Sequence, residues 1–164
     1  MNVKNAAYEY DLVVIGGGSG GVAGAVRAAA HGARVALLVP GEFGGTCVNV
    51  GCVPKKAMWL AAELSQRIDL AARLGFELPS PKLDWREFIV HRQRYIAGIH
   101  DSYRKRLDAA GIVHLPCRGR FIDAHTVETH QGSRVSGAHV LVATGGQPRR
   151  PDIPGAELGL VSDD

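Results

Sequence analysis

Residues 11–22 read Asp-Leu-Val-Val-Ile-Gly-Gly-Gly-Ser-Gly-Gly-Val, an apolar run that leads directly into a glycine-rich turn. The apolar run predicts a short buried strand, and the alanine-rich residues 22–31 predict a helix that ends at Gly32. A second apolar run over residues 34–39 completes the order strand, turn, helix, strand within about 30 residues. This order predicts a βαβ unit with two parallel strands.

Three glycines in this turn, at positions 16, 18 and 21, fit the spacing G-x-G-x-x-G. Gly16 permits the tight turn, Gly18 lets the backbone approach a pyrophosphate, and Gly21 lets the helix pack closely on the strand. The first turn of the helix also presents oriented amide groups to an anion. We therefore predict a dinucleotide site here, with an unliganded glycine-rich turn as the plain alternative.

One part of this fingerprint is missing. An acidic residue is expected at the end of the second strand, where it accepts hydrogen bonds from the ribose hydroxyls of the adenosine half. The strand ends instead at Val39, whose side chain cannot accept a hydrogen bond. Glu42 lies three residues further on, either reaching inward or remaining a solvated loop charge.

Two long helices are predicted next. The first spans residues 52–74, and the second spans residues 84–110 with one apolar face and Asp84 as its N-cap. A linker containing Pro79 and Pro81 joins them.

Short strands are predicted at residues 112–115, 120–122, 126–129 and 138–143, with a hairpin turn at Gln131-Gly132. The fold class is therefore α/β: a Rossmann-like domain in which a parallel sheet starts with a βαβ unit and is followed by two inserted helices and a small β-rich segment. Because the sequence ends without a clear closing element, we expect this domain to be incomplete.

The composition narrows the class of protein. The 164 residues are 46% hydrophobic, with a mean hydropathy of -0.01, which fits a folded chain. The 19 basic and 16 acidic residues are scattered, so we expect no nucleic-acid partner. No apolar run approaches the roughly 18 residues of a membrane helix, and the first ten residues contain no signal-peptide core, so we expect a cytoplasmic protein without a membrane partner.

The most specific stretch is residues 44–56, Gly-Gly-Thr-Cys-Val-Asn-Val-Gly-Cys-Val-Pro-Lys-Lys. Four residues separate Cys47 from Cys52, so the two can close a small disulfide loop. Cys52 opens a predicted helix, where the helix dipole favours a thiolate, and Lys55 and Lys56 add positive charge. A zinc site would need further Cys or His ligands at matching spacing, so we predict a redox pair and no metal site. Cys117 is given no role.

Together these motifs resemble the FAD-dependent pyridine nucleotide-disulfide oxidoreductases, and within them the glutathione reductase group. The resemblance runs through nearly the whole chain and also rests on Met58-Trp59, Tyr95, Tyr103, Ala143-Thr144-Gly145-Gly146 and Pro151-Asp152-Ile153-Pro154-Gly155. Lys55-Lys56 and the tyrosine-bearing helix favour a glutathione or trypanothione reductase over a dihydrolipoamide dehydrogenase. Trypanothione and mercuric reductases remain alternatives within the family.

The resemblance implies a role for each site residue. Cys52 is the thiol that contacts the flavin as a charge-transfer thiolate, Cys47 is the interchange thiol that attacks glutathione disulfide, and Lys55 lies by the reactive edge of the flavin. Ser19 and Tyr103 are implied near bound glutathione, although Tyr103 also suits core packing. The implied FAD contacts are Gly16, Gly18, Ser19, Gly20, Gly21, Gly45, Thr46, Cys47, Lys55, Gly119, Thr144 and Gly145.

The implied activity is hydride transfer from NADPH to FAD, reduction of the Cys47–Cys52 disulfide, and exchange with glutathione disulfide in a homodimer. Residues 1–164 are then the N-terminal part of the FAD-binding domain of an NADPH-dependent glutathione-disulfide reductase. The NADPH-binding and dimerisation domains are absent, and we expect no turnover by this chain alone. A noncatalytic FAD-binding remnant is the alternative from a different functional class.

Overall fold

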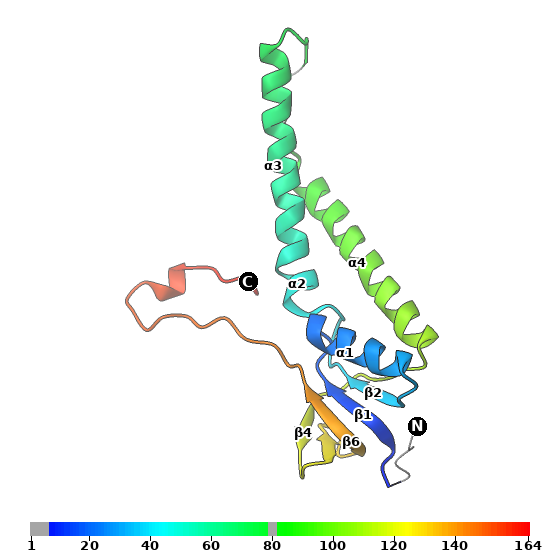
Figure 1. Ribbon diagram of the computed structural model, residues 1–164. Coiled ribbons are helices and arrows are strands. Elements are labelled where there is room, and N and C mark those ends of the chain that lie inside the picture. Colours follow the sequence, from blue (N-terminus) through cyan, green and yellow to red (C-terminus); the bar gives the residue numbers. More distant parts are fainter. Residues whose placement is uncertain (1–6, 79–81) are drawn as a thin grey trace.

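The computed structural model describes residues 7–78 and 82–164 (Figure 1). Its centre is a six-stranded sheet in the order β3-β2-β1-β6-β5-β4. Strands β1 (Tyr10–Ile15) and β2 (Val35–Leu38) are parallel, and helix α1 (Ser19–Ala30) connects them. The predicted βαβ unit is therefore confirmed, and with it the Rossmann-like α/β class.

The sheet is parallel on one side and antiparallel on the other. Strand β3 (Val113–Leu115) lies parallel to β2, and β6 (Arg134–Val142) lies parallel to β1. Strands β4 (Gly119–Phe121) and β5 (Thr126–Thr129) continue the sheet from β6 with antiparallel pairing. The predicted hairpin between β5 and β6 is confirmed.

Strand β6 begins at Arg134, whereas the sequence predicted a start at residue 138. Ser136 and Gly137 resemble turn residues, but both belong to the sheet. Ser136 pairs with Thr126, and a Cβ on Gly137 would lie 2.8 Å from Cγ2 of Val13. The pairing of this stretch with neighbouring strands therefore makes it a strand, although its residues locally favour a turn.

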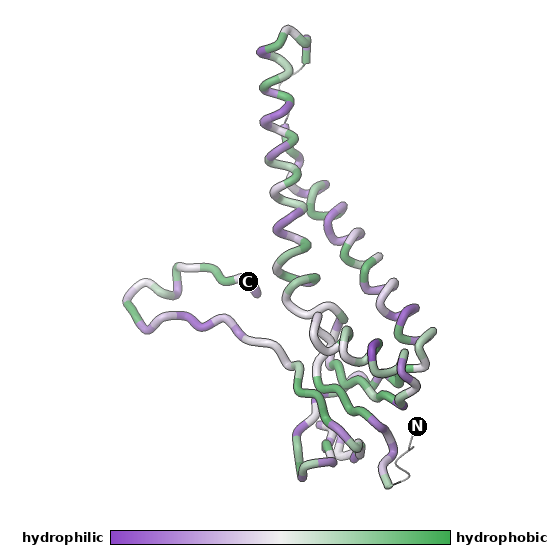
Figure 2. Tube along the Cα trace, in the orientation of Figure 1, coloured by the Kyte–Doolittle hydropathy of each residue, from purple (hydrophilic) through white to green (hydrophobic). Residues whose placement is uncertain are grey.

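The core lies on both faces of the sheet, as the alternation of side chains along a strand requires. Val14, Val35 and Leu37 pack on the face that α1 covers, together with Leu107 and Ile112. The opposite face buries a second cluster, made of Val13, Ile15, Ala36, Leu38, Cys117, Val127 and Val135. In Figure 2 the central strands are correspondingly hydrophobic.

Helices α3 (Cys52–Arg73) and α4 (Trp85–Ala109) confirm the two predicted insertions, and Figure 1 shows α3 projecting away from the sheet. The carboxylate of Asp84 accepts hydrogen bonds from the backbone amides of Arg86 and Glu87 at 2.9 and 3.1 Å, which confirms the predicted N-cap. The predicted linker at Pro79 and Pro81 lies outside the described residues. None of the helices in the described residues has the length and apolar character to cross a membrane.

Two short elements were not predicted. Helix α2 (Gly45–Asn49) lies within the cysteine motif, and its start was not predicted because two glycines, which disfavour helix, stand there. A 3-10 turn, η1 (Ala156–Leu158), lies in the C-terminal segment that runs away from the sheet in Figure 1.

Candidate active site

Some glycines of the turn are packed against neighbouring backbone, and others face open space. A Cβ on Gly16 would lie 2.2 Å from the backbone oxygen of Ala143, and one on Gly21 would lie 1.8 Å from the backbone oxygen of Gly16. At Gly18 the nearest atom would be Cα of Gly45 at 3.8 Å, and a Cβ on Gly20 would meet nothing within 4 Å. The fold itself therefore needs Gly16 and Gly21, whereas Gly18 and Gly20 keep a space open above the turn.

That space is a groove of about 560 Å³. It is bounded by the glycine turn, by the segment that follows β2, and by the residues that follow β6. Its lining includes Gly16, Gly17, Gly18, Ser19, Gly20, Pro40, Glu42, Gly44, Gly45, Thr46, Cys47, Ala143, Thr144, Gly145 and Gly146. Most of the residues that the resemblance assigned to FAD thus surround one groove.

The groove suits the diphosphate of a dinucleotide. Helix α1 begins beside it with Gly18 as N-cap, no side chain caps the helix, and its first turn carries no acidic residue. The backbone amides of that turn and the positive end of the helix dipole favour an anion. The glycine backbone leaves the room that such an anion needs.

The adenosine half has no acceptor at the expected position. Val39 is 4% exposed and belongs to the core, and a Cβ on Gly17 would lie 2.6 Å from Val39 Cγ2. Among the residues that line the groove, Glu42 alone carries a carboxylate.

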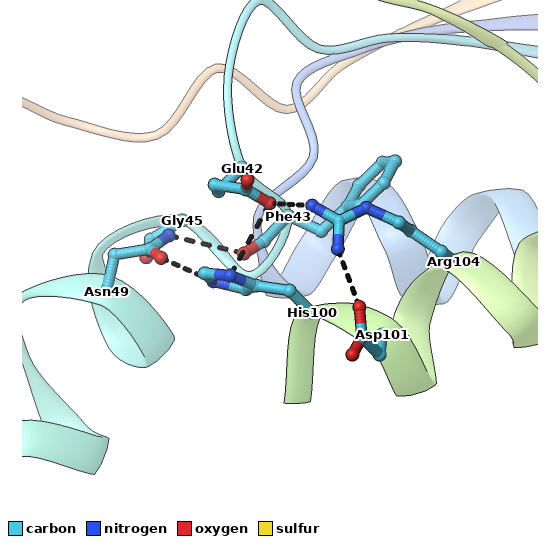
Figure 3. Close-up of polar contacts among 7 residues, drawn as sticks. All are labelled: Glu42, Phe43, Gly45, Asn49, His100, Asp101 and Arg104. Atoms are coloured by element: carbon cyan, nitrogen blue, oxygen red, sulfur yellow. Dashed lines mark hydrogen bonds and ion pairs between the residues drawn. The ribbon is translucent and has the colours of Figure 1, made fainter. Parts of the chain in front are cut away.

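Glu42 is anchored to α4 rather than left as a free loop charge (Figure 3). Its Oε2 lies 2.5 Å from Nη2 of Arg104 and 3.4 Å from Nδ1 of His100. Arg104 is held in turn by Asp101, at 2.9 Å. The side chain of Glu42 keeps 51% exposure.

A second set of hydrogen bonds in Figure 3 fixes helix α2. The side-chain nitrogen of Asn49 donates to the backbone oxygens of Gly45 and Phe43, at 2.9 and 3.2 Å. Its side-chain oxygen lies 2.7 Å from Nε2 of the buried His100, so Nε2 carries the proton and donates. His100 and Asn49 were not predicted as site residues, because a histidine on a helix face and an asparagine between cysteines carry no spacing signal.

Cys47 and Cys52 are free thiols, so the structure describes the reduced pair. Cys52 is exposed at the first position of α3, as predicted, and Cys47 is half-buried in α2. The hydrogen bond with Cys52 is the main cause that raises the pKa of Cys47, and burial raises this pKa further, whereas Lys55 opposes the shift. Cys47 therefore retains its proton more strongly than an ordinary cysteine.

The two thiols line different cavities. Cys47 lines the groove, whereas Cys52 and Lys55 line a cavity of about 830 Å³ between α3 and α4. The other residues around this second cavity are Val53, Lys56, Ala57, Leu60, Phe88, His91, Arg92 and Tyr95, none of them acidic. Nε of Arg92 is buried without a hydrogen-bond partner in the described residues. The cavity is thus apolar with an excess of cationic groups, and the sequence pattern did not predict it.

Besides Cys52, four assigned residues lie outside the groove. Gly21 packs against the turn, and Lys55 lines the second cavity. Gly119 opens β4, where a Cβ would lie 2.6 Å from side-chain atoms of both Leu38 and Val127. Tyr103 is half-buried against the core cluster, which agrees with the packing alternative. Their roles toward a ligand stay predictions.

Cys117 is 4% exposed in the second core cluster, and burial raises its pKa. No group of three or more potential metal ligands occurs among residues 7–78 and 82–164.

Comparisons with known proteins agree with this geometry. The family described as pyridine nucleotide-disulphide oxidoreductase matches residues 10–163. A thioredoxin reductase from Emiliania huxleyi is 42% identical over 173 aligned positions, which cover 97% of this chain and 35% of the relative. A glutathione reductase from Yarrowia lipolytica is 42% identical over 167 positions, which cover 94% of this chain and 36% of the relative. The chain thus spans about a third of the length of these relatives.

Proposed function

Because this chain belongs to the pyridine nucleotide-disulphide oxidoreductase family, we propose that it is the FAD-binding and dithiol-bearing part of an NADPH-dependent glutathione-disulfide reductase. The observation that carries the proposal is the reduced pair of Cys47 and Cys52, with Cys47 lining a groove that suits a diphosphate and Cys52 at the start of the adjoining helix α3.

Residues of this chain would hold the FAD. The amides at the start of α1 would hold the diphosphate, and Gly45, Thr46 and Thr144 would line the remainder of the bound molecule. Bound FAD would supply two-electron chemistry between a nicotinamide donor and the Cys47–Cys52 disulfide.

The thiol chemistry balances on two cysteines and one substrate disulfide. The thiolate of Cys47 attacks one substrate sulfur, so the substrate S–S bond breaks, the first substrate thiolate leaves, and a mixed disulfide forms on Cys47. The thiolate of Cys52 then attacks Cys47 Sγ, which releases the second substrate thiolate and forms the Cys47–Cys52 disulfide. Two electrons pass from the cysteine pair to the substrate, and the protons lost by the cysteines are taken up by the two products.

The raised pKa of Cys47 implies that a base must take its proton before the attack. In the family that the sequence resembles, a His–Glu pair from the partner subunit has this role, and we extend the homodimer to this protein on that basis. Exposed apolar side chains along α3 support this proposal, because a partner subunit would cover them. Their exposures are 45–59%, for Met58, Trp59, Leu60, Leu64 and Leu70.

The cationic side chains beside the cysteine pair favour an anionic substrate. Lys55, Lys56 and Arg92 place positive charge around Cys52 without a carboxylate among the lining residues. Glutathione disulfide is a small anionic disulfide and fits this chemistry. A thioredoxin-like protein disulfide is the second candidate, because the thioredoxin reductase relative has the same 42% identity as the glutathione reductase.

Thiol trapping tests the proposed roles without any cofactor. The reduced protein is mixed with glutathione disulfide, and the products are identified by mass spectrometry. We expect the Cys52→Ser variant to retain one glutathione on Cys47, the Cys47→Ser variant to retain little, and the wild type to form its internal disulfide. Equal trapping by both single variants would contradict the assignment of Cys47 as the attacking thiol. Faster oxidation by an oxidised thioredoxin would favour the second candidate.

The visible spectrum after FAD addition and removal of the excess tests the cofactor. Retained flavin whose long-wavelength absorbance changes on dithiol addition supports a flavin beside the pair. A protein that exchanges thiols but retains no flavin would support a chain that needs further segments for the cofactor. A protein that neither retains flavin nor exchanges thiols would favour the noncatalytic remnant.

A further inference from the structure

Val39, which follows β2, cannot accept a hydrogen bond from the ribose of a bound dinucleotide. Val39 is buried, and its methyl groups pack against the glycine turn, since a Cβ on Gly17 would lie 2.6 and 2.8 Å from them. The next two residues, Pro40 and Gly41, offer no side-chain acceptor. Glu42 therefore carries the first side chain after β2 that could accept a hydrogen bond from a ribose hydroxyl in the groove.

The two oxygens of Glu42 are not equivalent. Arg104 and His100 both contact Oε2, at 2.5 and 3.4 Å. Arg104 donates its hydrogen bond to Oε2, and Oε1 accepts none from the residues that the structure describes. The carboxylate is thus held by one oxygen and keeps the other available to a ligand, while its side chain remains 51% exposed at the groove.

The anchor comes from a rigid element. Arg104 and His100 stand one helical turn apart on α4, so their side chains share a face. Asp101 holds the guanidinium of Arg104 at 2.9 Å, and Asn49 holds the ring of His100 at 2.7 Å. An acceptor fixed before the ligand arrives loses less side-chain entropy on binding than a free loop carboxylate would.

We propose that Glu42, positioned by Arg104 and His100, is the carboxylate that accepts the ribose hydroxyls of the dinucleotide in this groove. The inference rests on the proposed dinucleotide site and adds a specific group to it. It moves the acceptor from the end of β2 to the loop after it and makes α4 a part of the nucleotide site.

A ligand pair separates this contact from general effects on the loop. ADP and 2′,3′-dideoxy-ADP differ only in the ribose hydroxyls, and their dissociation constants are measured by calorimetry on the wild-type protein and its variants. We expect the wild type to bind ADP about 10- to 100-fold more tightly than the dideoxy compound, the range for hydrogen bonds to a charged group. In Glu42→Ala the ratio falls to about one, and in the isosteric Glu42→Gln it takes an intermediate value.

Arg104→Leu tests the positioning role, since it removes the anchor and leaves the carboxylate. We expect its ratio to fall below that of the wild type, which loss of loop stability alone would not cause, because both ligands would then weaken equally. Glu128→Gln is the matched control: this glutamate pairs with Arg120 at 2.5 Å on β4 and β5, and its ratio should equal that of the wild type.

The outcomes separate the two levels of the argument. A wild-type ratio well above one that survives in Glu42→Ala and Glu42→Gln overturns the role of Glu42 and leaves the nucleotide site intact. Equal affinities of the wild type for ADP and 2′,3′-dideoxy-ADP would also overturn the role of Glu42 and leave the nucleotide site intact. Failure of the folded wild type to bind ADP at all overturns the proposed dinucleotide site together with this inference.

Discussion

Nε2 of His100 lies 2.7 Å from the side-chain oxygen of Asn49, and this contact joins the middle of α4 to the short helix that carries Cys47. Asn49 in turn caps the backbone oxygens of Gly45 and Phe43. One buried histidine therefore braces the short helix that carries Cys47, although it belongs to a helix distant in sequence.

The His100→Leu substitution should loosen this segment. It leaves the oxygen of Asn49 without its donor, and an unmade buried hydrogen bond costs about 1–3 kcal/mol. We expect the free energy of unfolding, measured in urea, to fall by about that amount, and the alkylation of Cys47 by iodoacetamide to become several-fold faster. His31→Leu, which alters an exposed histidine at the end of α1, is the control and should change neither value. Unchanged alkylation in a destabilised His100→Leu protein would show that the histidine serves the core alone.

Gly18→Ala should weaken ligand binding without affecting folding, whereas Gly21→Ala should prevent folding. At Gly18 the nearest atom to a new Cβ would be 3.8 Å away, so we expect normal folding with at least tenfold weaker ADP binding, because the methyl group occupies the space next to the diphosphate. At Gly21 the new Cβ would lie 1.8 Å from a backbone oxygen, so we expect a loss of folded protein. Circular dichroism and calorimetry measure the two effects, and full ADP affinity in Gly18→Ala would argue against a diphosphate at this turn.

The pH at which Cys47 ionises should respond to its neighbours with opposite signs. The hydrogen bond with Cys52 raises the pKa of Cys47, so Cys52→Ala should shift the midpoint of Cys47 alkylation to lower pH. The positive charge of Lys55 lowers that pKa, so Lys55→Met should shift the midpoint to higher pH. Rates of iodoacetamide alkylation between pH 6 and 10, resolved by peptide mass spectrometry, give both midpoints. Shifts of the same sign in both variants would contradict this account.

A carboxylate introduced at the end of β2 should strengthen FAD binding mainly when Glu42 is removed. In the Glu42→Ala background, Val39→Glu should tighten FAD by about 1.5–3 kcal/mol, the scale of a hydrogen bond to a charged group. In the wild-type background the gain should be much smaller, because an acceptor is already in place. Flavin fluorescence titration measures both dissociation constants, and equal gains in the two backgrounds would indicate that Glu42 makes no contact with the ribose.

Much of the fold was readable from the sequence, because its signals are local. The apolar runs and the glycine spacing predicted β1, α1 and β2, and the periodicity of α4 with Asp84 predicted a helix and its cap. Helix α2 was missed because five residues that begin with glycine carry no helical period. The early start of β6 was missed because its reason is a contact between Gly137 and Val13, more than a hundred residues apart in sequence.

The candidate site was readable only in part for the same reason. The groove and the cysteine pair follow from motifs in which each residue type has a chemical reason. The anchoring of Glu42 and the cavity between α3 and α4 depend on side chains of α4 that lie far from their partners in the sequence. No spacing rule connects Glu42 with Arg104 before the helix is placed.

The separation of the two thiols between two cavities has a practical consequence. A molecule that fills the space beside Lys56 and Arg92 need not compete with a nucleotide above the glycine turn, because the two spaces share no lining residue. An inhibitor aimed at the cavity between α3 and α4 would thus be noncompetitive toward ADP in the groove, whereas a flavin that reaches Lys55 would compete with it.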